Sequence, residues 1–149
     1  MRALLVIDIQ PDTVKPRHAE NLIPTWNEII EAHDPSLVAY IANLRPFARI
    51  PEVATFAEGL DVVSDNVFFK RVPNAFSNRH LDEWLKGKGI DAVTLIGIDG
   101  NWCIKATAIG AIENGFQTTI LEDAIASSND KAFRNKTMPK LRNRGVDFK

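Results

Sequence analysis

Three side chains in this sequence supply an acid, an amine and a thiol, and each lies at the end of an apolar segment. Asp8 follows the aliphatic run Ala3–Ile7, Lys70 ends a short apolar segment, and Cys103 lies just beyond the run Ala92–Ile98. A thiolate is a strong nucleophile, a carboxylate can accept its proton, and an ammonium stabilises the negative charge that results. If the fold brings these groups together, they could perform nucleophilic catalysis.

The position of Cys103 points most clearly to chemistry. The turn Gly97–Trp102 precedes it, and the segment Cys103–Asn114 has the composition of a helix that ends at Gly115. Unpaired N–H groups and partial positive charge at a helix N-terminus stabilise a thiolate, so we expect the thiol pKa to lie below about 8.5. The alternative is that Cys103 is a small buried apolar side chain, as most free cysteines are.

The elements that would position these groups alternate between strand and helix. Continuous aliphatic runs are typical of buried parallel strands, and apolar residues three and four apart indicate helices. This alternation predicts an α/β fold with a mostly parallel sheet and helices on both faces. The predicted strands are Ala3–Ile7, Leu37–Ala42, Val67–Phe69, Ala92–Ile98, Gln117–Leu121 and Val146–Phe148; the predicted helices are Asn21–His33, Leu81–Lys88, Cys103–Asn114 and one within Ala126–Arg144, and Arg45–Leu60 is predicted to be a loop.

Ligands of such sheets bind beyond the carboxyl ends of the strands, near the point where the strand order reverses. Besides Asp8, Lys70 and the turn Gly97–Cys103, this rule selects Glu122 and Asp123. The acid, amine and thiol therefore become candidates for one site because the predicted topology ends their strands at the same edge.

Length and composition exclude several other classes of protein. The 149 residues predict a single domain over 1–149, and the net charge of −1 gives no electrostatic reason to expect nucleic acid or membrane as a partner. No apolar stretch is long enough to cross a bilayer. One cysteine allows no disulfide within the chain, which fits a reducing compartment and leads us to expect a cytoplasmic protein.

Taken together, the motifs resemble the isochorismatase-like cysteine hydrolases, which include nicotinamidases and N-carbamoyl amidohydrolases. The resemblance runs from Ala3 to about Ser127 and is weak only between Pro11 and Leu60. The matching features are Ala3–Gln10 with its Asp-x-Gln end, Phe69-Lys70 followed by Asn74-Ala75-Phe76, Leu81 to Ile90, Gly97-Ile98-x-x-Asn101-x-Cys103-Ile104-x-x-Thr107-Ala108, Gly115-Phe116 and Leu121-Glu122-Asp123-Ala124.

This resemblance implies a fold, a site and an activity. It implies a three-layer Rossmann-like sheet in the order 3-2-1-4-5-6 and hydrolysis of a small-molecule amide, carbamoyl or ureido C–N bond without a cofactor. It also implies a homo-oligomer and a non-proline cis peptide between Ile98 and Asp99. The implied residues are the triad Asp8, Lys70 and Cys103, the backbone N–H groups of Asp99 and Cys103 as the oxyanion hole, and Gln10 and Trp102 as substrate contacts.

Several departures from the family pattern narrow the range of activities that we expect within the family. Nicotinamidases hold a metal with Asp and His after the second strand, whereas Asn43–Leu60 contains neither residue type, so we expect no metal and disfavour nicotinamidase activity. Isochorismatases proper lack the nucleophilic cysteine, so Cys103 disfavours that activity too. Asp99 stands where the family usually has a small residue, and we expect its carboxylate to face the mouth of the site.

Two other classes of function stay open from the sequence. One is a divergent, non-catalytic family member that binds a ligand or forms part of an assembly, and the other is a thiol redox sensor that would need a partner for Cys103. The basic stretch Lys131–Arg144 would suit an anionic partner. A solvated helix face with cations near its C-terminus is the simpler interpretation of that stretch.

Overall fold

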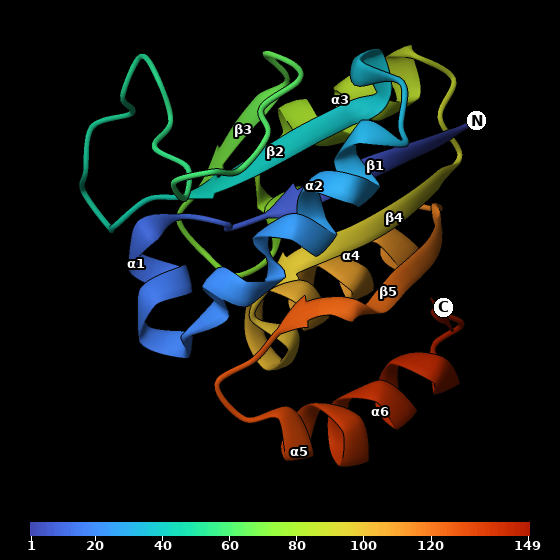
Figure 1. Cartoon of the computed structure of the whole chain (residues 1–149). Helices are drawn as coiled ribbons and strands as arrows, with labels where there is room; N and C mark the ends of the chain where they lie inside the picture. The colour runs from blue at the N-terminus through green and yellow to red at the C-terminus, as the bar shows by residue number, and fades with distance from the viewer.

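The computed structural model describes residues 1–149, and its centre is a parallel sheet of six strands (Figure 1). The strand order is 3-2-1-4-5-6 and every neighbouring pair is parallel, as predicted. β1 and β4 are adjacent although they are distant in sequence, and the strand order reverses there. The strands are β1 (Arg2–Ile7), β2 (Val38–Asn43), β3 (Val67–Lys70), β4 (Ala92–Ile98), β5 (Gln117–Ala126) and β6 (Asp147–Phe148).

Helices cover both faces of the sheet and create two separate apolar cores. One core lies between the sheet and α3, α4 and α6, and the other lies under α1, α2 and the long segment after β2 (Figure 1). The side chains of β1 alternate between these cores because successive strand residues point to opposite faces. The helices are α1 (Pro11–Val14), α2 (Ile23–Glu31), α3 (Arg79–Gly87), α4 (Lys105–Glu113), α5 (Asp130–Ala132) and α6 (Met138–Asn143).

The two central strands approach closely at their carboxyl ends. Gly97 pairs with Ile7 and has a φ of 125°, and a Cβ on it would lie 2.1 Å from the Ile7 carbonyl oxygen. Only glycine fits this position. The approach places Asp8, which follows Ile7, beside the turn that leaves β4.

The structure differs from the sequence prediction in two of the segments after β4. The helix predicted to begin at Cys103 begins earlier, with a π-helical turn over Gly100–Ile104 that leads into α4. The predicted C-terminal helix consists of α5, a second π-helical segment at Phe133–Thr137, and α6. Cys103 therefore lies within a wide helical turn.

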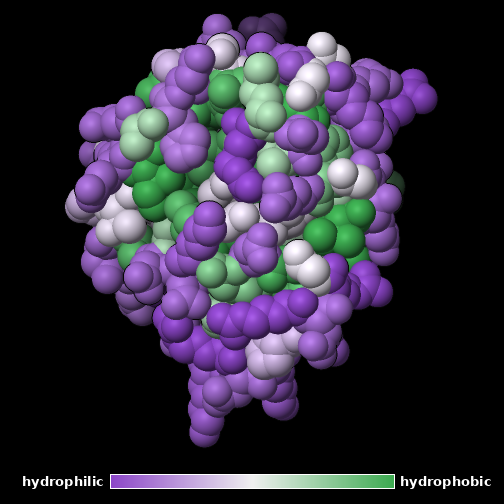
Figure 2. All heavy atoms as spheres, turned by 90° about the vertical axis from the view of Figure 1, so that its right-hand side faces the viewer, coloured by the Kyte–Doolittle hydropathy of each residue, from purple (hydrophilic) through white to green (hydrophobic).

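The opposite end of the molecule, where the strands begin, faces the viewer in Figure 2. Hydrophilic residues cover most of this face, and hydrophobic residues show between them in scattered patches. No helix in the structure has the length and apolar character needed to cross a membrane.

Candidate active site

The three predicted reactive side chains lie together at the carboxyl end of the sheet. The Lys70 ammonium Nζ is 2.9 Å from Asp8 Oδ2 and 3.3 Å from Cys103 Sγ. Asp8 and Lys70 are 2% and 3% exposed, and Cys103 is half-buried. Lys70 can therefore stabilise negative charge on either the carboxylate or the sulfur, because it is within hydrogen-bond distance of both.

Asn43, which the sequence analysis did not select, completes the surroundings of Lys70. It ends β2, between the strands that carry Asp8 and Lys70, and its Oδ1 lies 3.2 Å from Nζ. Asn43 directly follows the apolar stretch of its strand, and the strand-end rule that selected Lys70 could have found it. The ammonium thus has a neutral acceptor as well as its two reactive neighbours.

Gln10, predicted to contact substrate, is buried and uses its side chain within the protein. Its Oε1 accepts the Asn43 backbone N–H at 2.8 Å, and its Nε2 donates to the Thr55 carbonyl at 3.3 Å. It therefore fixes the end of β2 and, with it, the Asn43 acceptor of Lys70. A direct substrate contact by Gln10 remains a prediction.

The Asp8 carboxylate is held in a position from which it can accept a proton. Its backbone has a φ of 52°, in the left-handed region, and Thr13 Oγ1 donates to its carbonyl oxygen. Burial raises the pKa of Asp8, while Lys70 and a hydrogen bond with Cys103 lower it in part. The second carboxylate oxygen, Oδ1, is buried and has no other partner in the protein.

The prediction of a depressed thiol pKa is wrong for the free protein. Burial raises the pKa of Cys103 to about 11, and the nearby Asp8 carboxylate adds to the rise. Lys70 opposes both effects without cancelling them. The thiol is therefore neutral near pH 7, and it lies beside the Asp8–Lys70 ion pair.

The turn between β4 and α4 contains the predicted oxyanion donors. The Ile98–Asp99 peptide is cis, as the family resemblance implied. The Asp99 N–H donates no hydrogen bond within the protein, so it remains available to a ligand. A donor at this turn, beside Cys103, is suited to hold an oxygen that gains negative charge.

The Asp99 carboxylate does not face the mouth of the site, and that expectation is wrong. The residue is 2% exposed, and its carboxylate accepts hydrogen bonds from Arg17 Nε at 3.0 Å and from the Ser128 N–H at 2.8 Å. The Asn101 N–H and Ser127 Oγ donate to the other oxygen. Burial alone would raise the pKa of Asp99, but these hydrogen bonds outweigh it and lower the pKa. Asp99 therefore links the turn to the end of β5 and to Arg17.

Helix α4 is packed against the segment that follows Lys70. Thr107 Oγ1 accepts the Ala75 N–H at 3.0 Å. One turn further on, a Cβ on Gly110 would lie 2.4 Å from Asn74 Oδ1. These contacts fix the helix that follows Cys103 relative to the loop that follows Lys70.

Trp102, the other predicted substrate contact, lies on the surface. Its side chain is 63% exposed and lines a cavity whose wall does not include Asp8, Lys70 or Cys103. Its contact with a substrate stays a prediction. The remaining strand-end acids, Glu122 and Asp123, lie in the middle of β5, where Glu122 is partly exposed and Asp123 exposed.

The fold is shared with solved structures that span almost the whole chain. A pyrazinamidase of Pyrococcus horikoshii in complex with zinc superposes with a TM-score of 0.81 over 99% of this chain and 98% of that one, at 20% identity. This chain has no group of three or more His, Cys, Asp and Glu side chains placed to hold a metal ion. Its residues therefore do not fit a resident zinc.

Two curated relatives match shorter segments. Maleamate amidohydrolase of Pseudomonas putida is 30% identical over 74 residues, which is 49% of this chain and 35% of that protein. Nicotinamidase of Saccharomyces cerevisiae is 32% identical over 73 residues, which is 48% of this chain and 34% of that protein. The matched segments thus span about a third of the length of these relatives.

The match to a protein family covers nearly the whole chain. The Isochorismatase domain matches residues 2–148, which include the strand end at Asp8, the end of β3 at Lys70 and the turn at Cys103. The sheet order agrees with the order that the resemblance implied. The chain therefore belongs to the isochorismatase family.

Proposed function

We propose that the protein is a cysteine hydrolase that cleaves a small-molecule amide, carbamoyl or ureido C–N bond through a thioester intermediate. The observation that carries this proposal is the position of Lys70, which bonds at once to Asp8 and to Cys103. The family membership and the two relatives, which are named for amides, support the reaction class. The proposed triad is Asp8, Lys70 and Cys103.

The first half of the reaction forms the thioester. As the substrate carbonyl approaches, Asp8 takes the proton from Cys103, and Sγ forms a bond to the carbonyl carbon. The oxygen gains the negative charge, and the backbone N–H groups of Asp99 and Cys103 stabilise it. When the carbonyl re-forms, the C–N bond breaks and Asp8 gives its proton to the leaving nitrogen.

The second half clears the thioester with water. Asp8, again a carboxylate, takes a proton from the water, and the resulting hydroxide attacks the thioester carbon. The C–S bond breaks, the carboxylic or carbamic acid product leaves, and the proton on Asp8 returns to Cys103. The single carboxylate thus acts as base and acid in turn.

The charges of the site explain why the raised thiol pKa is compatible with this reaction. Moving the proton from Cys103 to Asp8 moves one negative charge from the carboxylate to the sulfur. Because the proton stays within the site, the total charge of the site is the same before and after the transfer. Lys70 contacts Asp8 and Cys103, so the negative charge has a cationic neighbour in both states. The transfer therefore avoids the large cost of creating an unpaired buried charge.

An ammonia-release screen over small amides, carbamoyl compounds and ureides tests the proposal. We expect at least one compound to be hydrolysed by the wild type and not by Cys103→Ala. The intact mass of quenched wild-type enzyme should show an acyl adduct, which Cys103→Ala lacks. Ammonia release that persists in the variant would refute the cysteine mechanism, and a screen without turnover would favour the non-catalytic family member.

We also infer a cytoplasmic homo-oligomer that acts on a small molecule. The segment after β2 supports the oligomer because it exposes several large apolar side chains, which a second copy of the chain would cover. The free thiol of the only cysteine supports a reducing compartment. Light scattering of the purified protein would contradict this inference if it gave the monomer mass. The exposed apolar residues are Phe47, Ile50, Val53 and Val62.

A further inference from the structure

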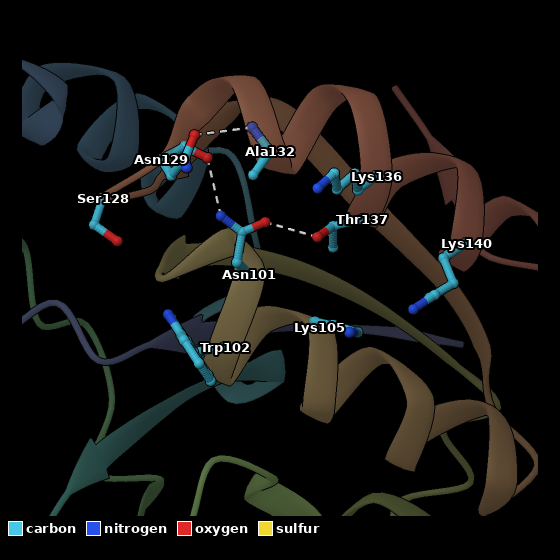
Figure 3. A pocket seen from close by; sticks show the side chains of 9 residues that line it. All are labelled: Asn101, Trp102, Lys105, Ser128, Asn129, Ala132, Lys136, Thr137 and Lys140. Carbon is cyan, nitrogen blue, oxygen red and sulfur yellow. Dashed lines mark hydrogen bonds between the residues drawn. The ribbon is translucent and has the colours of Figure 1, made fainter.

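A polar cavity of about 440 Å³ lies between the turn that carries Cys103 and the C-terminal helical segment (Figure 3). Its volume falls within the usual range for small-molecule sites, roughly 300–1,000 Å³. It is separate from the buried triad, whose side chains do not line it. The lining residues are Asn101, Trp102, Lys105, Ser128, Asn129, Ala132, Lys136, Thr137 and Lys140.

The lysines give this cavity an uncompensated positive charge. Lys105 lies at the start of α4, and Lys136 and Lys140 come from the C-terminal segment across the cavity (Figure 3). None of the three forms an ion pair or a hydrogen bond within the protein, and no acidic residue lines the cavity. In a chain of net charge −1, this local concentration of cations is a specific feature of the cavity.

The spacing of two of these lysines opposes stability. Lys136 and Lys140 are four residues apart and line the same cavity, and their like charges repel each other. Ala132, four residues before Lys136, also lines the cavity. An anionic ligand between the lysines would remove this repulsion.

The polar wall of the cavity is already fixed without a ligand. Asn101 Nδ2 donates to Ser127 Oγ at 2.9 Å. Figure 3 shows two further bonds of Asn101: its Nδ2 donates to the Asn129 carbonyl at 2.9 Å, and its Oδ1 accepts from Thr137 Oγ1 at 2.6 Å. Asn129 in turn accepts the Ala132 N–H. This network joins the turn of Cys103 to the C-terminal segment, so the two walls are pre-organised, which lowers the cost of ligand binding.

We propose that this cavity binds a small phosphate-bearing molecule with a flat ring, which is the chemistry of a mononucleotide. Ammonium groups are compact point charges with rotatable donors, and such groups bind phosphate in proteins. Three of them line the cavity and no acidic side chain does. The ring contact is assigned to Trp102, whose 63% exposed indole borders the cavity and offers a stacking surface. The cavity wall includes none of Asp8, Lys70 and Cys103, so the proposed binding does not depend on the proposed hydrolysis being correct.

Calorimetric titration of the full chain tests the proposal with AMP, inorganic phosphate and adenosine as probes. AMP should bind, and both fragments should bind at least about tenfold more weakly because each lacks one of the two contacts. Lys136→Gln/Lys140→Gln should weaken AMP binding by about tenfold or more.

Control variants show whether AMP binding depends on this cavity, on positive charge elsewhere in the protein or on the catalytic cysteine. Lys86→Gln/Lys88→Gln removes the same charge from the end of α3 and should leave AMP binding within about twofold of wild type, as should Cys103→Ala. Trp102→Leu should weaken AMP and leave phosphate binding unchanged. The proposal is overturned if AMP does not bind, if phosphate binds as tightly as AMP, or if both lysine pairs have equal effects.

Discussion

Replacing Lys70 with methionine should make the stability of the protein depend on pH through Asp8. Methionine keeps much of the buried lysine stem but removes the ammonium, which is 2.9 Å from the Asp8 carboxylate. The carboxylate is 2% exposed, and its Oδ1 already has no hydrogen-bond partner. In the variant, the ionised form of Asp8 is a buried charge without a counterion.

The magnitude follows from the loss of one member of a buried pair. At pH 8 we expect a loss of about 3–5 kcal/mol in the free energy of unfolding, a large part of the stability of a typical domain. Burial raises the folded-state pKa of Asp8, and the loss of Lys70 raises it further. A carboxyl group with a raised folded-state pKa contributes stability at low pH and loses it as the pH rises towards that pKa. As the pH falls and Asp8 binds a proton, the penalty should fall towards about 1 kcal/mol, the value of lost hydrogen bonds.

Urea unfolding of wild type and Lys70→Met at pH 5, 6.5 and 8 measures this dependence, with equal m-values as the check on two-state behaviour. Asp8→Asn in the Lys70→Met background is the control, because it removes the titrating group and should abolish the difference between the pH values. A penalty of the same size at all three pH values would refute the reasoning, and so would an undiminished pH dependence in the double variant.

Three further perturbations test other parts of the site. The rate of Cys103 alkylation by iodoacetamide should rise about tenfold per pH unit from pH 7 to 10 without levelling off, since the thiol pKa is about 11. Asp8→Asn should raise the rate at pH 7. A plateau near pH 8 in the wild type would contradict the raised thiol pKa. Any hydrolysis found should survive exhaustive chelation with EDTA, whereas a loss that zinc restores would reveal a metal site. Asp99→Ala should lower the free energy of unfolding by about 3 kcal/mol, because Arg17 and the Ser128 N–H lose a charged acceptor; an unchanged urea midpoint would show that these bonds contribute nothing.

The sheet could be predicted from the sequence because its central strands are runs of mostly aliphatic residues without a charge after Arg2. β4 has the predicted bounds of Ala92–Ile98. β5 extends to Ala126, beyond the predicted end at Leu121, because its pairing with β4 shifts register between Leu95 and Gly97 and resumes past the charged pair at 122–123. A prediction based on hydrophobic pattern ends a strand at its first charged residues, so it does not find the part of the strand that lies beyond them.

The candidate site could be predicted from the sequence only in part. Strand ends and the family resemblance identified Asp8, Lys70 and Cys103, since parallel strands end at a common edge. The contact between Arg17 and Asp99 joins residues far apart in the chain, and no pattern in the sequence marks it. The raised thiol pKa was also missed, because the helix-terminus argument considers local backbone charge, whereas burial is set by the whole fold.

The contact between Gly110 and Asn74 limits how this sequence can change over evolutionary time. Alanine at position 110 would push against the Asn74 amide, and that amide cannot simply move, because its Oδ1 also accepts the Phe76 N–H at 2.9 Å. A smaller residue at position 74 would make room but would lose that hydrogen bond. Each single change is therefore unfavourable, and a larger residue at position 110 fits only together with a smaller one at position 74. We expect the two positions to covary among relatives that keep the same spacing between the lysine loop and the cysteine helix.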